Sequence, residues 1–112
     1  MRPSSLTVTA SGLSNPIPLC RYTYGYAVAV TMQTAGAIYT LQQSFSDPFV
    51  AYSTSYNVSG VWINSDDPVM VNGSANRTSN FSYPPRAIRL NVTAGVSAGN
   101  PVTLTIIPLD GP

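Results

Sequence analysis

Near the end of the chain, apolar and polar residues alternate with a period of two, and this pattern constrains the fold most strongly. The alternation forms two runs, at residues 86–93 and 102–107, separated by a Gly/Ser/Asn-rich gap. Its apolar members are Ile88, Leu90, Val92, Val102, Leu104 and Ile106. Because successive side chains of a strand point to opposite faces, each run is typical of a strand with one buried face. We expect the two runs to pair as an antiparallel hairpin, with the apolar set buried and Arg89 on the outer face.

Similar alternating runs recur along the rest of the chain. They are residues 5–10, 21–32, 37–45 and 61–63, and a short strand could also form at 69–71. The segments 46–60 and 64–85 are predicted mainly as long connections, and ten prolines and eight glycines supply turns. About six to eight short antiparallel strands therefore predict one all-β domain over residues 1–112, a jelly-roll or β-sandwich, or a small barrel. The first and last strands share a Leu/Val–Thr alternation, and such terminal strands often lie close together in sandwiches.

The chain carries very few charges, which excludes several classes of function. Only 8% of residues are charged, the net charge is +1, and histidine is absent. Without histidine there is no Ser–His–Asp or Cys–His site, and acid–base catalysis would depend on four aspartates and seven tyrosines. The small net charge gives no footprint for nucleic acid or an anionic membrane, and no segment approaches the ~20 apolar residues of a membrane span. We expect a protein that is not an enzyme and has no nucleic-acid or membrane partner.

Metal and cofactor motifs are also missing. Cys20 is the single cysteine, so the sequence predicts neither an intrachain disulfide nor a zinc cluster. The segment 63–73 is rich in oxygen ligands but lacks the spacing of an EF-hand loop and its closing Glu. Asp66 and Asp67 precede Pro68 and are expected in a solvated turn rather than in a paired carboxylate site. The sequence therefore predicts no metal and no cofactor.

Five asparagines occupy Asn-x-Ser/Thr sequons. They are Asn57, Asn72, Asn76, Asn80 and Asn91. In a chain so rich in Ser and Thr such matches arise by composition, and the first residues show no apolar segment of signal-peptide length. We therefore do not expect these asparagines to be glycosylated.

Tyrosines near position 24 are candidate partner contacts. Tyr22, Tyr24 and Tyr26 share one face of their strand, beside Arg21, and Tyr and Arg are enriched at the centres of protein interfaces. The predicted interface residues are Arg21, Tyr22, Tyr24, Tyr52 and Tyr56. In the alternative interpretation, Tyr22 and Tyr24 cover an edge of the sandwich and Tyr26 enters the core. Exposed tyrosines and Trp62 would also suit a carbohydrate-binding surface.

An ion pair is expected beside the first alternating run. Asp47 follows the strand at 37–45, and either Arg86 or Arg89 could pair with it. The stem of Arg86 is expected to pack beside Tyr83. Such a pair would hold the loop after residue 45 against the strand at 86–93 and, if exposed, would contribute at most about 1 kcal/mol.

Three motifs follow one another within residues 37–107: a strand ending in QQSFSDPF, a Trp-containing segment VWIN, and the run YPPRAIRLNVT. In this order, and more loosely over residues 5–32, the chain resembles a group of small bacteriophage virion proteins. The matching residues are Gln43, Ser44, Phe45, Asp47, Phe49, Trp62, Tyr83, Pro84, Arg86, Arg89, Asn91 and Thr93. This pattern is similar to that of the jelly-roll cement, or decoration, proteins on the outside of tailed-phage heads. The resemblance implies a small all-β protein that oligomerises and bridges neighbouring major capsid proteins.

The expected function is therefore that of a non-enzymatic virion structural protein. We expect a capsid decoration protein on the capsid exterior, a homo-oligomer (dimer or trimer) whose partner is the major capsid protein. Low charge fits this role, because like charges that face each other across a symmetric contact are destabilising. A phage tail or head-fibre component and a carbohydrate-binding adhesin module stay open as alternatives.

Overall fold

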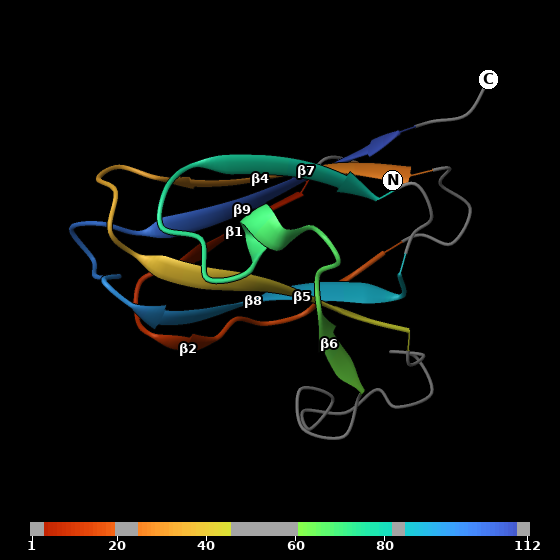
Figure 1. The fold of residues 1–112 in the computed structure, drawn as a ribbon, viewed down its shortest axis with the longest axis horizontal. Coiled ribbons are helices and arrows are strands. Elements are labelled where there is room, and N and C mark those ends of the chain that lie inside the picture. Colours follow the sequence, from red (N-terminus) through yellow and green to blue (C-terminus); the bar gives the residue numbers. More distant parts are fainter. Residues whose placement is uncertain (1–3, 20–24, 46–60, 82–84, 110–112) are drawn as a thin grey trace.

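Two antiparallel β-sheets face each other in the computed structural model, which describes residues 4–19, 25–45, 61–81 and 85–109 (Figure 1). The first sheet has the order β1-β9-β4-β7. Its strands are β1 (Ser4–Val8), β9 (Val102–Leu109), β4 (Gly25–Met32) and β7 (Arg77–Phe81). The second sheet has the order β2-β8-β5-β6, with β3 also paired to β8. Its strands are β2 (Gly12–Leu13), β8 (Ala87–Ala94), β5 (Ile38–Ser44), β6 (Trp62–Asn64) and β3 (Ile17–Pro18).

The strand order is that of a jelly roll. The short strands β2 and β3 pair with successive parts of β8, so together they take the place of one interrupted edge strand. When β2 and β3 are counted as one strand, each sheet has four strands. The connection from β5 to β6 joins two neighbouring strands of the same sheet. The other connections between the described strands pass from one sheet to the other, as in the double Greek key of a jelly roll. The prediction of an all-β jelly-roll or β-sandwich is confirmed.

The predicted hairpin of residues 86–93 and 102–107 is wrong. The two segments form β8 and β9, which lie in opposite sheets and have different partners. All six of their alternating apolar side chains are nevertheless fully buried. The alternation predicts which face of a strand meets the core, but both sheets meet the same core, so it does not select the partner strand. The connection 95–101 spans the roughly 10 Å between the sheets instead of closing a turn.

The terminal strands lie side by side, as expected from their similar sequences. β1 and β9 are antiparallel neighbours, with Leu6 opposite Leu104 and Val8 opposite Val102. On the other side of β9, β4 contributes its inward side chains to the core. These are Tyr26, Val28, Val30 and Met32, and all four are buried.

Residues 64–81 are more ordered than the sequence predicts. The expected short strand at 69–71 is replaced by η1, a 3-10 turn at Pro68–Met70, whose Met70 is fully buried in the core. Residues 77–81 form β7, which pairs with β4 at the edge of the first sheet. Its sequence, RTSNF, shows little apolar alternation, because Phe81 is its one apolar residue. Ser79 and Phe81 are its partly buried residues, and the other three are exposed. An edge strand of this composition resembles a loop when it is judged by periodicity alone.

The segment between η1 and β7 is fastened to β5 at Tyr39. The backbone N–H of Gly73 donates to the carbonyl of Tyr39 at 2.9 Å, and the N–H of Tyr39 donates to the carbonyl of Gly73 at 3.0 Å. The Tyr39 hydroxyl donates to the carbonyl of Ala75 at 2.7 Å. Burial raises the pKa of Tyr39 above its ordinary value, against a smaller lowering by the charge of Arg77.

Candidate functional site

The five interface residues predicted from the sequence lie outside the described residues. They are Arg21, Tyr22, Tyr24, Tyr52 and Tyr56, and their role stays a prediction. Cys20, Asp47 and Tyr83 also lie outside the described part, so the expected ion pair and the packing of Arg86 stay untested. Tyr26 is fully buried, as the core alternative predicted for it. Three other features of the described residues can carry function.

The first feature is a polar row on the outer face of the second sheet, covered by Trp62. Arg89 faces away from the core as predicted, yet only 6% of it is exposed. Its Nε donates to Oε1 of Gln42 at 2.9 Å, and Nε2 of Gln42 donates to Oδ1 of Asn64 at 3.1 Å. The guanidinium carbon of Arg89 lies 4.1 Å from the centre of the Trp62 ring. Ser44, opposite Trp62 in the register, is fully buried.

This arrangement stabilises the sheet more readily than it binds a ligand. A guanidinium over an aromatic face contributes roughly 0.5–2 kcal/mol, depending on how far it is removed from water. One face of the Trp62 ring is already occupied by Arg89, so that face is closed to a sugar ring. Three residues of the motifs noted in the sequence, Ser44, Trp62 and Arg89, thus lie on one surface although they are far apart in the sequence.

The second feature is the outer face of the first sheet, on which none of the described outward side chains is charged. Its outward side chains alternate with those of the core on four neighbouring strands, and most are Thr or Ala. They are Ser5, Thr7, Ala27, Ala29, Thr31, Thr78, Asn80, Thr103, Thr105 and Ile107, and we call this surface the Ala–Thr face. Because Ala27 and Ala29 are small and lie on a central strand, the surface is hollowed above them, with a volume of about 520 Å³.

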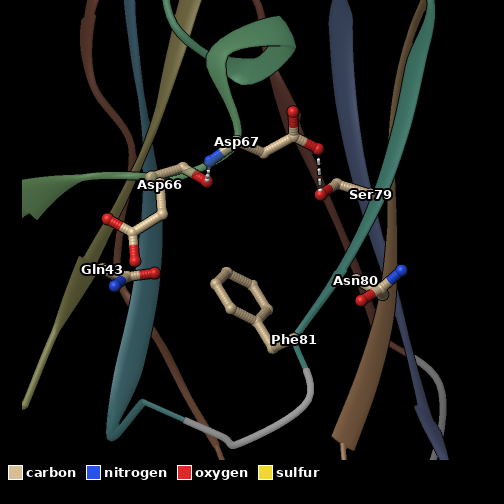
Figure 2. A pocket seen from close by; sticks show the side chains of 7 residues that line it. Gln43, Asp66, Asp67, Ser79, Asn80 and Phe81 are labelled. Atoms are coloured by element: carbon tan, nitrogen blue, oxygen red, sulfur yellow. Dashed lines mark hydrogen bonds between the residues drawn. The ribbon is translucent and has the colours of Figure 1, made fainter.

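The third feature is a cavity of about 290 Å³ between the two sheets, on the side where β6 and β7 form their edges (Figure 2). Its lining comes from β5, from the segment between β6 and η1, and from β7. The lining residues are Gln43, Ser65, Asp66, Asp67, Ser79, Asn80 and Phe81, and we call this site the Gln43 cavity. In Figure 2, Phe81 lies between Gln43 and Asp66 on one side and Ser79 on the other, whereas Asn80 points away from the cavity.

Hydrogen bonds fix one wall of the Gln43 cavity. Oδ1 of Asp67 accepts from the N–H of Val69 at 3.2 Å and caps η1, while Oδ2 accepts from the Ser79 hydroxyl at 2.6 Å. The N–H of Asp67 donates to Oγ of Ser65 at 3.2 Å. Asp66 is exposed, as predicted for a solvated turn, but the half-buried Asp67 is part of the structure. The expectation for Asp67 is corrected because its carboxylate joins η1 to β7.

The sequence contains a signal for this cavity that the apolar pattern obscures. Gln43 continues the inward series Tyr39 and Leu41 on β5, and only 3% of it is exposed. A long amide in a core-facing position is costly to bury, so it marks a place where polar groups must meet something other than apolar side chains.

The comparisons with known proteins leave the chain without an identified family. No family model matches the chain. No curated protein and no solved structure matches it either. Within the described ranges, no group of three or more His, Cys, Asp or Glu side chains could hold a metal ion. Likewise, no helix in these ranges has the length and apolar character that crossing a membrane would require.

Proposed function

We propose that this protein is a non-enzymatic structural component of a bacteriophage virion, a decoration protein that binds major capsid proteins on the head exterior as a homo-oligomer. The resemblance of residues 37–107 to cement proteins supports this proposal, and so does the scarcity of acid–base groups. A jelly roll serves viral capsid proteins and lectins alike, so the fold alone does not assign the role. The observation that carries the proposal is the Ala–Thr face.

The Ala–Thr face has the composition of a protein contact surface. None of its outward side chains is charged, so neither a second copy nor a capsid subunit meets like-charge repulsion there. Ala and Thr also lose little side-chain freedom when they are covered, which lowers the cost of docking. An uncharged sheet face is therefore well suited to repeated contacts within a lattice.

The size of the face fits a small specific interface. Four strands about 4.8 Å apart, with a rise of about 3.3 Å per residue, give a projected area of roughly 400 Å². The accessible area of a corrugated surface exceeds its projection, and a specific contact needs roughly 500 Å² from each partner. The Ala–Thr face with its immediate rim reaches this size.

Co-sedimentation with phage heads tests the proposal. Purified protein is mixed with heads of the phage that encodes it, assembled without this protein, and the pelleted fraction is measured, with light scattering for the free protein. We expect saturable binding to heads and a dimer or trimer in solution. Ala29→Arg places a charge at the centre of the face and should abolish pelleting, whereas Ala98→Arg, in an exposed turn, should not.

The opposite results would reject the proposal. A strictly monomeric protein that never pellets with heads would exclude both the oligomer and the decoration role. Pelleting with isolated tails rather than heads would assign the protein to the tail. Circular dichroism of both arginine variants serves as the folding control.

A further inference from the structure

We propose that the Gln43 cavity binds a neutral saccharide, one hexose-sized ring at a time. This inference does not depend on the decoration role, because the groups proposed to bind the sugar, Gln43, Asp66 and Phe81, do not belong to the Ala–Thr face. Sugar binding requires polar groups that can exchange hydrogen bonds with hydroxyls, together with an apolar surface for the ring. The cavity brings both together from three separate segments of the chain (Figure 2).

The first argument is the state of the Gln43 side chain. Only 3% of this residue is exposed, and its amide makes no hydrogen bond to the described part of the chain. Among the described residues, every side-chain polar atom that is fully enclosed has a hydrogen-bond partner. The amide of Gln43 has no such partner among these residues, so it is not fully enclosed and must open onto the cavity that Gln43 lines. An amide offers two donors and an acceptor, which is the combination that pairs with neighbouring sugar hydroxyls.

The second argument is the preorganised wall opposite Gln43. Ser79, Asp67 and Ser65 are joined by hydrogen bonds, so their oxygens are held in place before a ligand arrives. The Asp66 carboxylate lies at the rim beside Gln43 and is not held in this network. Carboxylates accept strong hydrogen bonds from hydroxyl donors. Asp66 can therefore accept from a sugar hydroxyl while Gln43 bonds its neighbour.

The third argument is the aromatic ring in the cavity. Phe81 is half-buried, packs against the core and lies between the two polar sides in Figure 2. The face of an aromatic ring is electron-rich, so it attracts the weakly positive C–H groups on the flat side of a pyranose. Because Phe81 is anchored by the core, this platform does not have to be ordered when the ligand binds.

Charge and size select a sugar over other small ligands. Among the described residues, the lining carries Asp66 and Asp67 and no cationic side chain, which disfavours anions. A guanidinium or ammonium group would suit the carboxylates but would occupy only part of about 290 Å³. That volume equals roughly ten water molecules at about 30 Å³ each, which leaves room for one hexose together with a few waters.

Titration with simple glycosides tests the inference. The methyl glycosides of galactose, glucose, mannose and N-acetylglucosamine are added to isotope-labelled protein, and amide shifts are followed by NMR. We expect saturable shifts with at least one glycoside, concentrated at Gln43, Asp66 and Phe81. Gln43→Met keeps the side-chain shape but removes the amide, and should weaken binding by about tenfold. Gln33→Met, at an exposed turn, is the matched control and should bind as the unaltered protein does.

Three results would overturn the inference. They are no saturable shift with any glycoside, equal binding by Gln43→Met, and tighter binding of arginine methyl ester than of every glycoside. The last would assign the cavity to a basic side chain. Should Gln43→Met fail to fold, Asp66→Asn at the exposed rim replaces it and is expected to weaken binding in the same way. The cavity variant is also tested for pelleting with phage heads. If it pellets as the unaltered protein does, a failure of the saccharide inference does not count against the decoration role.

Discussion

Removing one hydroxyl group should show how strongly the segment after η1 holds the jelly roll together. In Tyr39→Phe the buried ring stays, but the carbonyl of Ala75 loses the donor that now lies 2.7 Å away. Loss of such a hydrogen bond costs about 1–2 kcal/mol. An unfolding entropy of about 2.1 cal/mol/K per residue gives roughly 0.24 kcal/mol/K for this chain, so the melting temperature should fall by about 4–8 °C.

The same variant should also change the pH dependence of stability. Burial raises the pKa of Tyr39 above its ordinary value of 10.0, so the folded protein keeps this tyrosine neutral at pH values where the unfolded chain ionises it. The stability that this difference provides is complete below pH 10 and declines as pH rises through the folded pKa, by up to about 1.4 kcal/mol per pH unit. Phenylalanine does not titrate, so the two proteins should become more alike above pH 10.

Thermal unfolding followed by circular dichroism from pH 7 to pH 11 measures both effects. The other tyrosines titrate equally in the two proteins, so the difference between the two melting temperatures isolates Tyr39. Equal melting temperatures at pH 7 would refute the role of the Ala75 hydrogen bond. A difference that stays constant up to pH 11 would refute the burial argument for the pKa.

Three further substitutions test other parts of the structure by the same measurement. Leu90→Ala in the core should cost about 2–5 kcal/mol, and a loss below about 1 kcal/mol would mean that the face assignment of β8 is wrong. Gly95→Ala should cost more than about 1 kcal/mol, because this residue has φ +75° and a Cβ would lie 2.5 Å from the carbonyl oxygen of Gly36. Gly99→Ala is the control, because its Cβ would meet only the Ser97 hydroxyl oxygen, at 3.8 Å, and its melting temperature should stay near that of the unaltered protein. Trp62→Ala should cost about 0.5–2 kcal/mol by exposing the guanidinium stacked on its ring, and Trp62→Phe should recover part of this loss.

The sequence allowed the burial pattern to be predicted, but not the pairing of the strands. Alternation in β8 and β9 identified every inward side chain correctly, because burial depends on the local period of two. Pairing depends on long-range topology, and a Gly-rich connection of seven residues suits an inter-sheet crossing as well as a hairpin loop. The polar edge strand β7 was missed for a related reason, since only one of its side chains, Phe81, packs against the core cluster.

The candidate sites were harder to predict than the fold because each is assembled from distant segments. Trp62 and Arg89 meet through the register of β6, β5 and β8, which no local pattern reveals. The Gln43 cavity depends on η1 carrying Asp67 to β7, and η1 was itself expected to be a strand. Gln43 was the one local signal, a polar residue within an inward apolar series.

Electron cryo-microscopy of the intact phage particle is the most direct test of the decoration role. We expect jelly-roll density in repeated copies on the outside of the head, with the Ala–Thr face covered by a capsid subunit or by a second copy of the chain. Heads that lack this density, or copies whose Ala–Thr face is turned to solvent, would contradict it.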